Sequence, residues 1–233
     1  MRKLTTLPAA ALLMAGAAQA ETIGGLAHAD TARPAAGLNQ TDEYNLVADH
    51  DLLAQDPVAE DGLVKAIIEI PTGTSAKWEI SKDNPNTVFW EFRNDAPRIV
   101  NYLGYPGNYG SIPGTDLPQE QGGDGDPLDV LVLGQAVPRG ETIPVRVIGV
   151  LKMLDGGEQD DKLIAVLPGD SPFAGIESMT QLDAEFPGVS QIVDLWFTHY
   201  KGPDGGMESQ GFQDADTARA VLDEAIAYYK SAQ

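Results

Sequence analysis

Three carboxylates lie close together on a glycine-rich turn. Asp124, Asp126 and Asp129 fall within residues 122–130, and the turn leads directly into the apolar run 130–133. Clustered carboxylates repel one another unless water or cations separate them, and hard divalent ions such as Mg²⁺ prefer all-oxygen surroundings. The turn therefore predicts a metal site. A solvated acidic turn is the alternative, whereas a calcium-binding β-helix needs many stacked copies and this chain has one.

A second acidic group follows downstream. Asp155, Glu158, Asp160 and Asp161 precede Lys162 and join the strand-like segments 143–154 and 163–167. Two carboxylate loops at the ends of strands could face one space and hold several metal ions. Metal ions about 4 Å apart can activate a water molecule and clamp phosphoryl oxygens. An ordinary acidic hairpin loop is an equally open interpretation.

Basic residues are scarce, and several lie beside acidic or aromatic polar groups. The chain has 15 lysines and arginines against 35 aspartates and glutamates. Arginine, lysine and tyrosine hydroxyls together suit phosphate oxygens, although each base alone is more simply a surface ion-pair partner. The pairs of interest are Lys77 with Glu79, Arg93 near Tyr105 and Tyr109, Lys162 after Asp160, and Lys201 after Tyr200.

The elements that would position these groups are mostly short strands. Apolar segments split by turn residues predict strands at 64–70, 77–80, 88–92, 130–133, 143–154 and 163–167. Strands at such close spacing indicate a small antiparallel barrel or sandwich. The last third changes to helical spacing, with a helix at 189–200 and a C-terminal helix that Asp214 or Asp216 could cap.

Composition limits the class of protein. The chain has 233 residues, 42% of them hydrophobic, which suits one globular domain, placed at residues 61–233. The absence of cysteine excludes disulfides, thiolate metal sites and cysteine nucleophiles. A formal charge of −20 disfavours nucleic acid and anionic membranes as partners and favours divalent cations.

The first twenty residues have the layout of a secretory signal peptide. Arg2 and Lys3 precede an apolar run at 7–18, and the small residues Ala18 and Ala20 form a cleavage site. We therefore expect cleavage near Ala20 and a periplasmic or secreted protein, with no lipid anchor because cysteine is absent. A buried N-terminal helix is the alternative. Residues 21–60 show no clear period and predict an extended or partly ordered arm.

Seven short motifs occur in a fixed order along the chain. They are IEIP at 68–71, KWE at 77–79, FRN at 92–94, YPGNYG at 105–110, DGDPLDV at 124–130, DGGEQDDK at 155–162 and HYK at 199–201. This series resembles the soluble family I inorganic pyrophosphatases across residues 63–201. The resemblance implies a mainly β (α+β) fold, a five-stranded OB-like closed barrel with flanking helices. It also implies hydrolysis of pyrophosphate to two phosphates by a metal-activated water.

The resemblance also implies roles for individual residues. Asp124, Asp129, Asp155 and Asp160 would bind metal ions directly, Glu69 and Glu79 would hold further ions mostly through water, and Asp126 would be the general base. The groups holding the phosphates would be Lys77, Arg93, Tyr109, Lys162, Tyr200 and Lys201, supported by Tyr105 and Glu158. Arg98 competes with Arg93 in a stretch whose length varies, and the FRN context favours Arg93.

The same resemblance implies the cofactor and the substrate. Several Mg²⁺ ions, with Mn²⁺, Co²⁺ or Zn²⁺ as substitutes, would bind pyrophosphate as its magnesium complex, and a homo-oligomer is allowed. Two other classes stay open: a broader metal-dependent phosphatase acting on organic phosphoesters, and a secreted metal-binding module without turnover. Retention of Asp126, Lys77, Arg93 and Tyr200 argues against the second, because a binding module has little use for a base.

Overall fold

The structure is a computed structural model that describes residues 22–23, 26–27, 32–59, 61–118, 122–123 and 125–232. The predicted signal peptide, residues 1–20, and the predicted metal ligand Asp124 lie outside the described residues.

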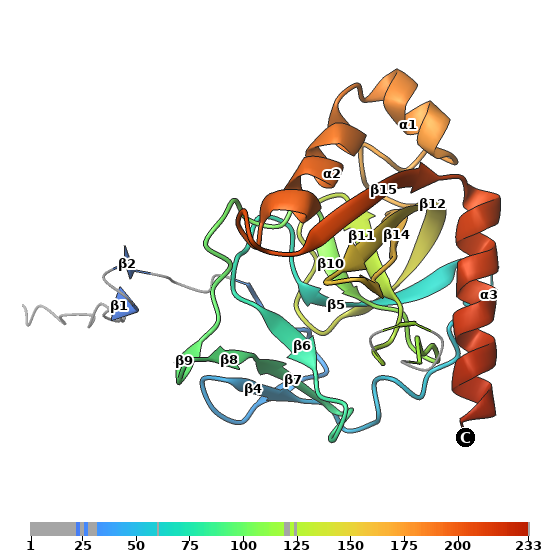
Figure 1. Ribbon diagram of the computed structural model, residues 1–233. Coiled ribbons are helices and arrows are strands. Elements are labelled where there is room, and N and C mark those ends of the chain that lie inside the picture. The colour runs from blue at the N-terminus through green and yellow to red at the C-terminus, as the bar shows by residue number, and fades with distance from the viewer. Residues whose placement is uncertain are drawn as a thin grey trace, which may run out of the picture.

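A ring of five strands forms the body of the molecule (Figure 1). β5, β10, β11, β14 and β12 pair in that order, and β12 pairs back onto β5. Their bounds are Val64–Ile70, Asn108–Ser111, Asp129–Leu133, Lys162–Val166 and Thr142–Asp155. Pairing is antiparallel except between β11 and β14, which run parallel. The mainly β architecture with an OB-like ring of five strands is therefore confirmed.

The ring strands read as nearly continuous apolar runs because both of their faces are covered. Alternate residues point into different cores: Leu131 and Ile164 belong to the core under α2, whereas Val130 and Leu163 belong to the core against α3. Burying each such side chain stabilises the fold by about 1.5–3 kcal/mol. Two covered faces thus hold the strand ends, where the acidic turns lie, in fixed positions.

A smaller sheet packs beside the ring. It runs in the order β3 (Asn39–Gln40), β4 (Asn45–Val47), β7 (Thr87–Trp90) and β6 (Trp78–Ile80). Leu46 and Leu52 are buried with Ile67 and Trp78 in a third core. Within the segment that we expected to be an arm, residues 38–53 therefore contribute side chains that pack onto the body.

Six further strands are found in the described residues. β13 and β15 extend the ring sheet from β12, whereas the pairs β1–β2 and β8–β9 are separate hairpins. Their bounds are Glu158–Gln159 for β13, Met207–Gln213 for β15, Thr22–Ile23 for β1, Leu26–Ala27 for β2, Phe92–Arg93 for β8 and Ala96–Pro97 for β9.

Among the described residues, three helices cover the ring (Figure 1). They are α1 (Met179–Glu185), α2 (Val189–His199) and α3 (Ala215–Ser231). The expected helices at 189–200 and at the C-terminus are confirmed, and Asp214 rather than Asp216 caps α3 by accepting from Thr217 N at 3.0 Å. Within the described part of the chain, no helix has the length and apolar character needed to cross a bilayer.

One glycine, Gly110, allows β10 to lie close to β5; β10 is the ring strand that carries Tyr109 and Ser111. A Cβ at Gly110 would lie 1.8 Å from the carbonyl oxygen of Ile67, so only glycine permits β10 to approach β5 this closely. The approach brings Tyr109 and Ser111 of β10 beside Glu69 of β5. The sequence of β10, Asn-Tyr-Gly-Ser, does not alternate between apolar and polar residues, which is why this strand was not predicted.

Candidate active site

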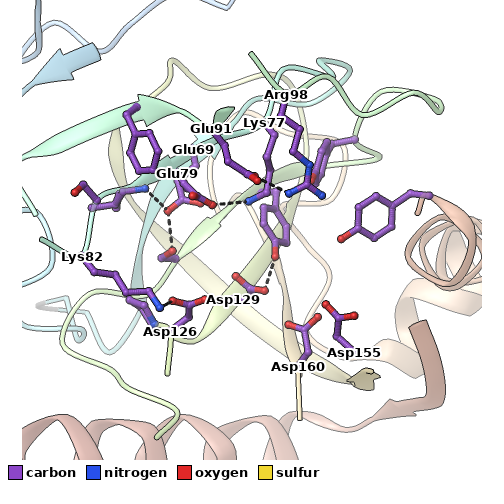
Figure 2. Close-up of a pocket in the computed structure, with 18 of the residues that line it drawn as sticks. Glu69, Lys77, Glu79, Lys82, Glu91, Arg98, Asp126, Asp129, Asp155 and Asp160 are labelled. Atoms are coloured by element: carbon purple, nitrogen blue, oxygen red, sulfur yellow. Dashed lines mark hydrogen bonds and ion pairs between the residues drawn. The ribbon is translucent and has the colours of Figure 1, made fainter. Parts of the chain in front are cut away.

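The predicted site residues gather around one cavity of about 500 Å³ at one end of the ring (Figure 2). Glu69, Lys77 and Glu79 lie on one wall, Asp155 and Asp160 lie on the other, and Asp129 lies between them. Ten of the predicted site residues line the cavity: Glu69, Lys77, Glu79, Tyr109, Asp126, Asp129, Asp155, Asp160, Tyr200 and Lys201. Arg93 and Lys162 are not in this lining, and Glu158 is exposed outside it.

Lys162 lies directly beneath the cavity floor, buried among acidic partners. Its Nζ donates to Asp129 Oδ2 at 2.8 Å and to Asp160 Oδ1 at 2.7 Å. The Tyr109 hydroxyl also donates to Asp129. Burial alone would lower the pKa of Lys162, but attraction to Asp129 and Asp160 outweighs it and raises that pKa. Burial alone would raise the pKa of Asp129, but Lys162 and Tyr109 hold that pKa below its usual range. Lys162 and Asp129 therefore stay ionised.

Glu69 occupies the opposite wall at the junction of β5, β6 and β10. Its Oε1 accepts from Ser111 Oγ at 2.8 Å and from the backbone N–H of Ile80 at 3.2 Å. Burial raises the pKa of Glu69 to about 7, with Lys77 opposing the rise. Lys77 in turn lies 3.3 Å from a carboxylate oxygen of Glu79. This wall can therefore present both a cation and carboxylates to a ligand.

The raised pKa of Glu69 predicts a pH-dependent stability in metal-free protein. Since this pKa is about 7 in the folded chain against an ordinary 4.5, the folded state binds more protons between these values. The free energy of unfolding should therefore fall as pH rises through that window, by about 1.4 kcal/mol per unit of pKa difference. In urea unfolding with EDTA, Glu69→Gln should lose much of this fall, while the surface control Glu208→Gln should keep it. Equal pH profiles for wild type and Glu69→Gln would contradict the assignment.

The acidic loop at residues 155–161 is held in place by the carboxylate of Asp161. Gly156 and Gly157, with φ of 60° and 96°, make the turn between Asp155 and Asp160. Asp161 is buried and accepts from Met153 N at 3.2 Å and Gln159 Nε2 at 2.7 Å. It also pairs with Lys152 of β12. These contacts fasten the loop to β12, so Asp155 and Asp160 can face the cavity.

An aromatic cluster fixes Tyr200 at the cavity edge. The rings of Trp196 and Tyr200 stack at 4.6 Å with an interplanar angle of 9°, and Tyr105 lies 4.3 Å from Trp196. Burial raises the pKa of Tyr105 and of Tyr109, so both remain neutral phenols that can donate hydrogen bonds. Lys201, the next residue, ion-pairs with Asp155 across the cavity mouth.

The two candidate arginines lie in different places, and this corrects the sequence interpretation. Arg93 is exposed on the β8–β9 hairpin, whose two-residue turn at Asn94 and Asp95 has φ of 53° and 60°. Such a tight turn carries Arg93 outward. Arg98 lines the cavity and its Nη1 lies 2.6 Å from Glu91 Oε2. The FRN context therefore favoured the wrong arginine for a cavity group, and we transfer the proposed phosphate contact to Arg98.

Replacing the two arginines separately should give different results. Charged hydrogen bonds contribute about 1.5–3 kcal/mol, so Arg98→Ala should lower kcat/KM for pyrophosphate by about 10–100-fold. The matched control Arg93→Ala should leave kcat/KM close to the wild-type value, because this side chain is exposed outside the lining. Steady-state phosphate release measures both. A larger loss for Arg93→Ala than for Arg98→Ala would return the role to Arg93.

Several further lining residues were not identified from the sequence, among them Lys82, Glu91 and Ser111. Lys82 ion-pairs with Asp126 and donates to the carbonyl of Gly125 at 3.1 Å. It thereby joins the turn after β6 to the upstream acidic turn. Ser111 and Glu91 bond to Glu69 and Arg98 respectively. Their positions beside motif residues were the only sequence signal.

The donor set of the cavity fits hard divalent cations. Asp129, Asp155 and Asp160 supply oxygen atoms only, and they form ion pairs with the ammonium groups of Lys162 and Lys201. Lysine ammonium groups at carboxylates mark places where positive charge is favoured. Among the described residues, no three acidic or histidine side chains converge closely enough to hold a metal ion as they stand. Asp124, the remaining predicted ligand, lies outside the described residues.

A ring of five strands with a cavity lined by carboxylates, lysines and tyrosines defines a mainly β protein with one charged, polar site. A family-wide sequence profile described as inorganic pyrophosphatase matches residues 66–230. The chain therefore belongs to the inorganic pyrophosphatase family.

Individual relatives agree with the family assignment. An inorganic pyrophosphatase of Kluyveromyces lactis is 36% identical over 162 residues, covering 64% of this chain and 56% of the relative. One from Mus musculus is 32% identical over 74% of this chain and 66% of the relative. The matched part of this chain thus spans less than two thirds of either relative. The solved type I inorganic pyrophosphatase of Toxoplasma gondii matches with a TM-score of 0.69 and 29% identity, covering 79% of this chain and 87% of that one.

Proposed function

We propose that the protein hydrolyses inorganic pyrophosphate to two phosphates with the help of bound divalent metal ions. The supporting observation is the convergence on one cavity of acidic groups from β5, β6, β11 and β12, a phenolic group from β10 and basic groups from the segments between strands. Family membership gives the same substrate class, because the similar proteins are named inorganic pyrophosphatases.

The residues in and below the cavity would have different roles in the reaction, according to their positions. Asp126, half exposed at the cavity mouth, would accept a proton from the attacking water. Lys77, Arg98 and Lys201 carry positive charge toward the cavity and would hold the phosphate oxygens, with the Tyr200 hydroxyl as a neutral donor. Lys162 lies below the floor and would keep Asp129 and Asp160 ionised and in place. No covalent intermediate is required.

Asp129, Asp155 and Asp160 are the described residues that would hold the metal ions, with Glu69 and Glu79 on the opposite wall. Bound divalent ions supply a lowered water pKa and charge neutralisation of the phosphoryl oxygens. Mg²⁺ is the proposed ion because all these ligands are oxygen atoms, with Mn²⁺, Co²⁺ or Zn²⁺ as substitutes. Pyrophosphate would then arrive as its magnesium complex.

Substrate comparison separates this proposal from a broader phosphatase. Purified protein should release phosphate from pyrophosphate much faster than from a nucleoside triphosphate or from p-nitrophenyl phosphate. The cavity of about 500 Å³ has polar and charged walls and little apolar surface to bind a base or a ring. Comparable kcat/KM values for all three substrates would favour the broader phosphatase. Metal binding without turnover of any of them would favour the non-catalytic module.

We also propose that the protein is exported and acts on pyrophosphate outside the cytoplasm, in the periplasm or beyond. The support is the signal-like pattern of residues 1–20. The mass of the chain recovered from the periplasmic fraction should correspond to cleavage near Ala20. Such an enzyme would supply phosphate from external pyrophosphate. If deleting the gene left growth on pyrophosphate as sole phosphorus source unchanged, this role would be lost.

A further inference from the structure

Arg139 is a buried cation that lies behind the cavity wall carrying Glu69. It belongs to the loop between β11 and β12, and its side chain is almost fully enclosed, with the residue 2% exposed. Its Nε donates to the backbone carbonyl oxygen of Glu69 at 2.9 Å. Burying a charged side chain is costly unless the protein bonds to it. The contacts of Arg139 therefore indicate which parts of the chain it holds together.

The second contact of this guanidinium is an indole ring on β6. The Cζ atom of Arg139 lies over the ring of Trp78, 4.4 Å from its centroid. Trp78 stands between Lys77 and Glu79 in the sequence, and both of these line the cavity. Among the described residues, the Trp78 Nε1 has no hydrogen-bond partner, so ring contacts hold this indole. Arg139 thus joins β6 to β5, the strand of Glu69.

A second indole extends this contact to Arg98. The ring of Trp90 stacks on that of Trp78 at 5.5 Å, with an interplanar angle of 25°. The Trp90 Nε1 donates to the carbonyl oxygen of Arg98 at 2.9 Å, and the backbone N–H of Lys77 donates to the same oxygen at 3.0 Å. Lys77 and Arg98, which both line the cavity (Figure 2), are therefore held by a stack that begins at Arg139.

The backbone of Arg139 is itself fastened to two segments. Its N–H donates to the carbonyl oxygen of Arg33 at 2.8 Å, and the N–H of Ala35 donates to the Arg139 carbonyl oxygen at 2.8 Å. The next residue, Gly140, has φ of 80° and donates to the carbonyl oxygen of Ile68 at 2.6 Å. Arg139 is thus anchored both to the segment before β3 and to β5, and its guanidinium is a fixed support for the wall.

We propose that Arg139 is a positioning residue for the phosphate-binding wall of the cavity. It would act through the two indoles on Lys77 and Arg98. This inference rests on the proposed function, because it assigns Arg139 a part in holding the pyrophosphate. Arginine suits the role because its planar guanidinium can stack on a ring while its N–H groups bond at the edge. Lysine keeps the charge without the planar group, and methionine keeps neither.

Equilibrium binding of methylene diphosphonate, a diphosphate analogue whose bridge resists hydrolysis, tests this role in the purified protein with Mg²⁺. Isothermal titration calorimetry should give Arg139→Met a Kd about tenfold above that of the wild type, the lower end of the loss expected for charged hydrogen bonds. Arg139→Lys should give an intermediate Kd. The KM for pyrophosphate should rise by a similar factor, with kcat changed less, because the displaced groups hold the substrate.

Arg146→Met is the matched control. Arg146 lies on β12, and its Nη1 donates to the carbonyl oxygen of Ala174 at 2.6 Å, in the loop before α1. This change also removes a guanidinium bonded to a backbone carbonyl, but it does so away from the cavity wall. Urea unfolding should show a loss of stability in both methionine variants. The Kd and KM of Arg146→Met should nevertheless stay near the wild-type values.

The outcomes distinguish this inference from the proposed function. Equal diphosphonate affinities for wild type and Arg139→Met, or an equal loss in Arg146→Met, would show that Arg139 does not position the wall. If Arg139→Met does not fold, Trp90→Phe decides, because it keeps a ring but removes the N–H that donates to Arg98; an unchanged Kd would then overturn the proposal. A wild type that binds the diphosphonate but releases no phosphate from pyrophosphate would contradict the proposed function alone. A wild type that does not bind it would contradict both.

Discussion

Asp126→Asn should lower the turnover of pyrophosphate by about 10²–10⁴-fold, the usual contribution of a general base. Asparagine keeps the size of the side chain but cannot accept the proton. Asp126 is half exposed and pairs with Lys82, so losing this ion pair should change stability little. Initial rates of phosphate release, together with Mg²⁺ titration by calorimetry, should show lost turnover with retained metal binding.

The matched control for this change is Asp83→Asn. Asp83 lines the same mouth, next to Lys82, and loses the same charge, but we assign it no part in proton transfer. Its turnover should stay near the wild-type value. Comparable losses in the two variants would show that general charge at the mouth matters and that Asp126 is not the base.

Lys162→Met should make the metal-free protein much less stable. The substitution keeps an unbranched side chain but leaves Asp129 and Asp160 without their shared cation. Breaking a buried ion pair from one side costs about 3–5 kcal/mol, which is a large part of the stability of a domain this size. Urea unfolding in EDTA should show a loss of this order. Added Mg²⁺ should restore part of it, because a bound cation can replace the ammonium group.

Lys65→Met provides the comparison, since Lys65 is a half-buried lysine on β5 that is not part of this ion cluster. Its stability should change little and should not acquire a new dependence on Mg²⁺. If Lys162→Met were as stable as wild type in EDTA, the buried ion cluster would not be the feature that holds this wall together.

The strands that the sequence predicted correctly are those whose pattern is strong. β5, β11 and β14 are short apolar runs covered on both faces, and their expected ranges differ from the observed ones by at most one residue at either end. β10 and β15 were missed because they contain glycine and polar residues, and tertiary pairing rather than local pattern forms them. The same holds for β4, which pairs with β7 although its surroundings looked irregular.

Among the site residues, the sequence also predicted some correctly and missed others. Motif residues such as Asp129, Asp155 and Tyr109 reach the cavity because ring strands carry them there. Arg98 could not be preferred over Arg93 from spacing, because the choice depends on the hairpin at Asn94 and Asp95. The sequence did not indicate a role for Lys82, because only the folded chain brings the turn after β6 to Asp126.

The most direct test of the central claim is phosphate release from pyrophosphate by purified protein, first with Mg²⁺ and then with excess EDTA. The account predicts rapid release that EDTA abolishes and that renewed Mg²⁺ restores. No release with Mg²⁺, Mn²⁺, Co²⁺ or Zn²⁺ from protein shown to be folded would contradict it, and release that persists undiminished in EDTA would contradict the metal requirement.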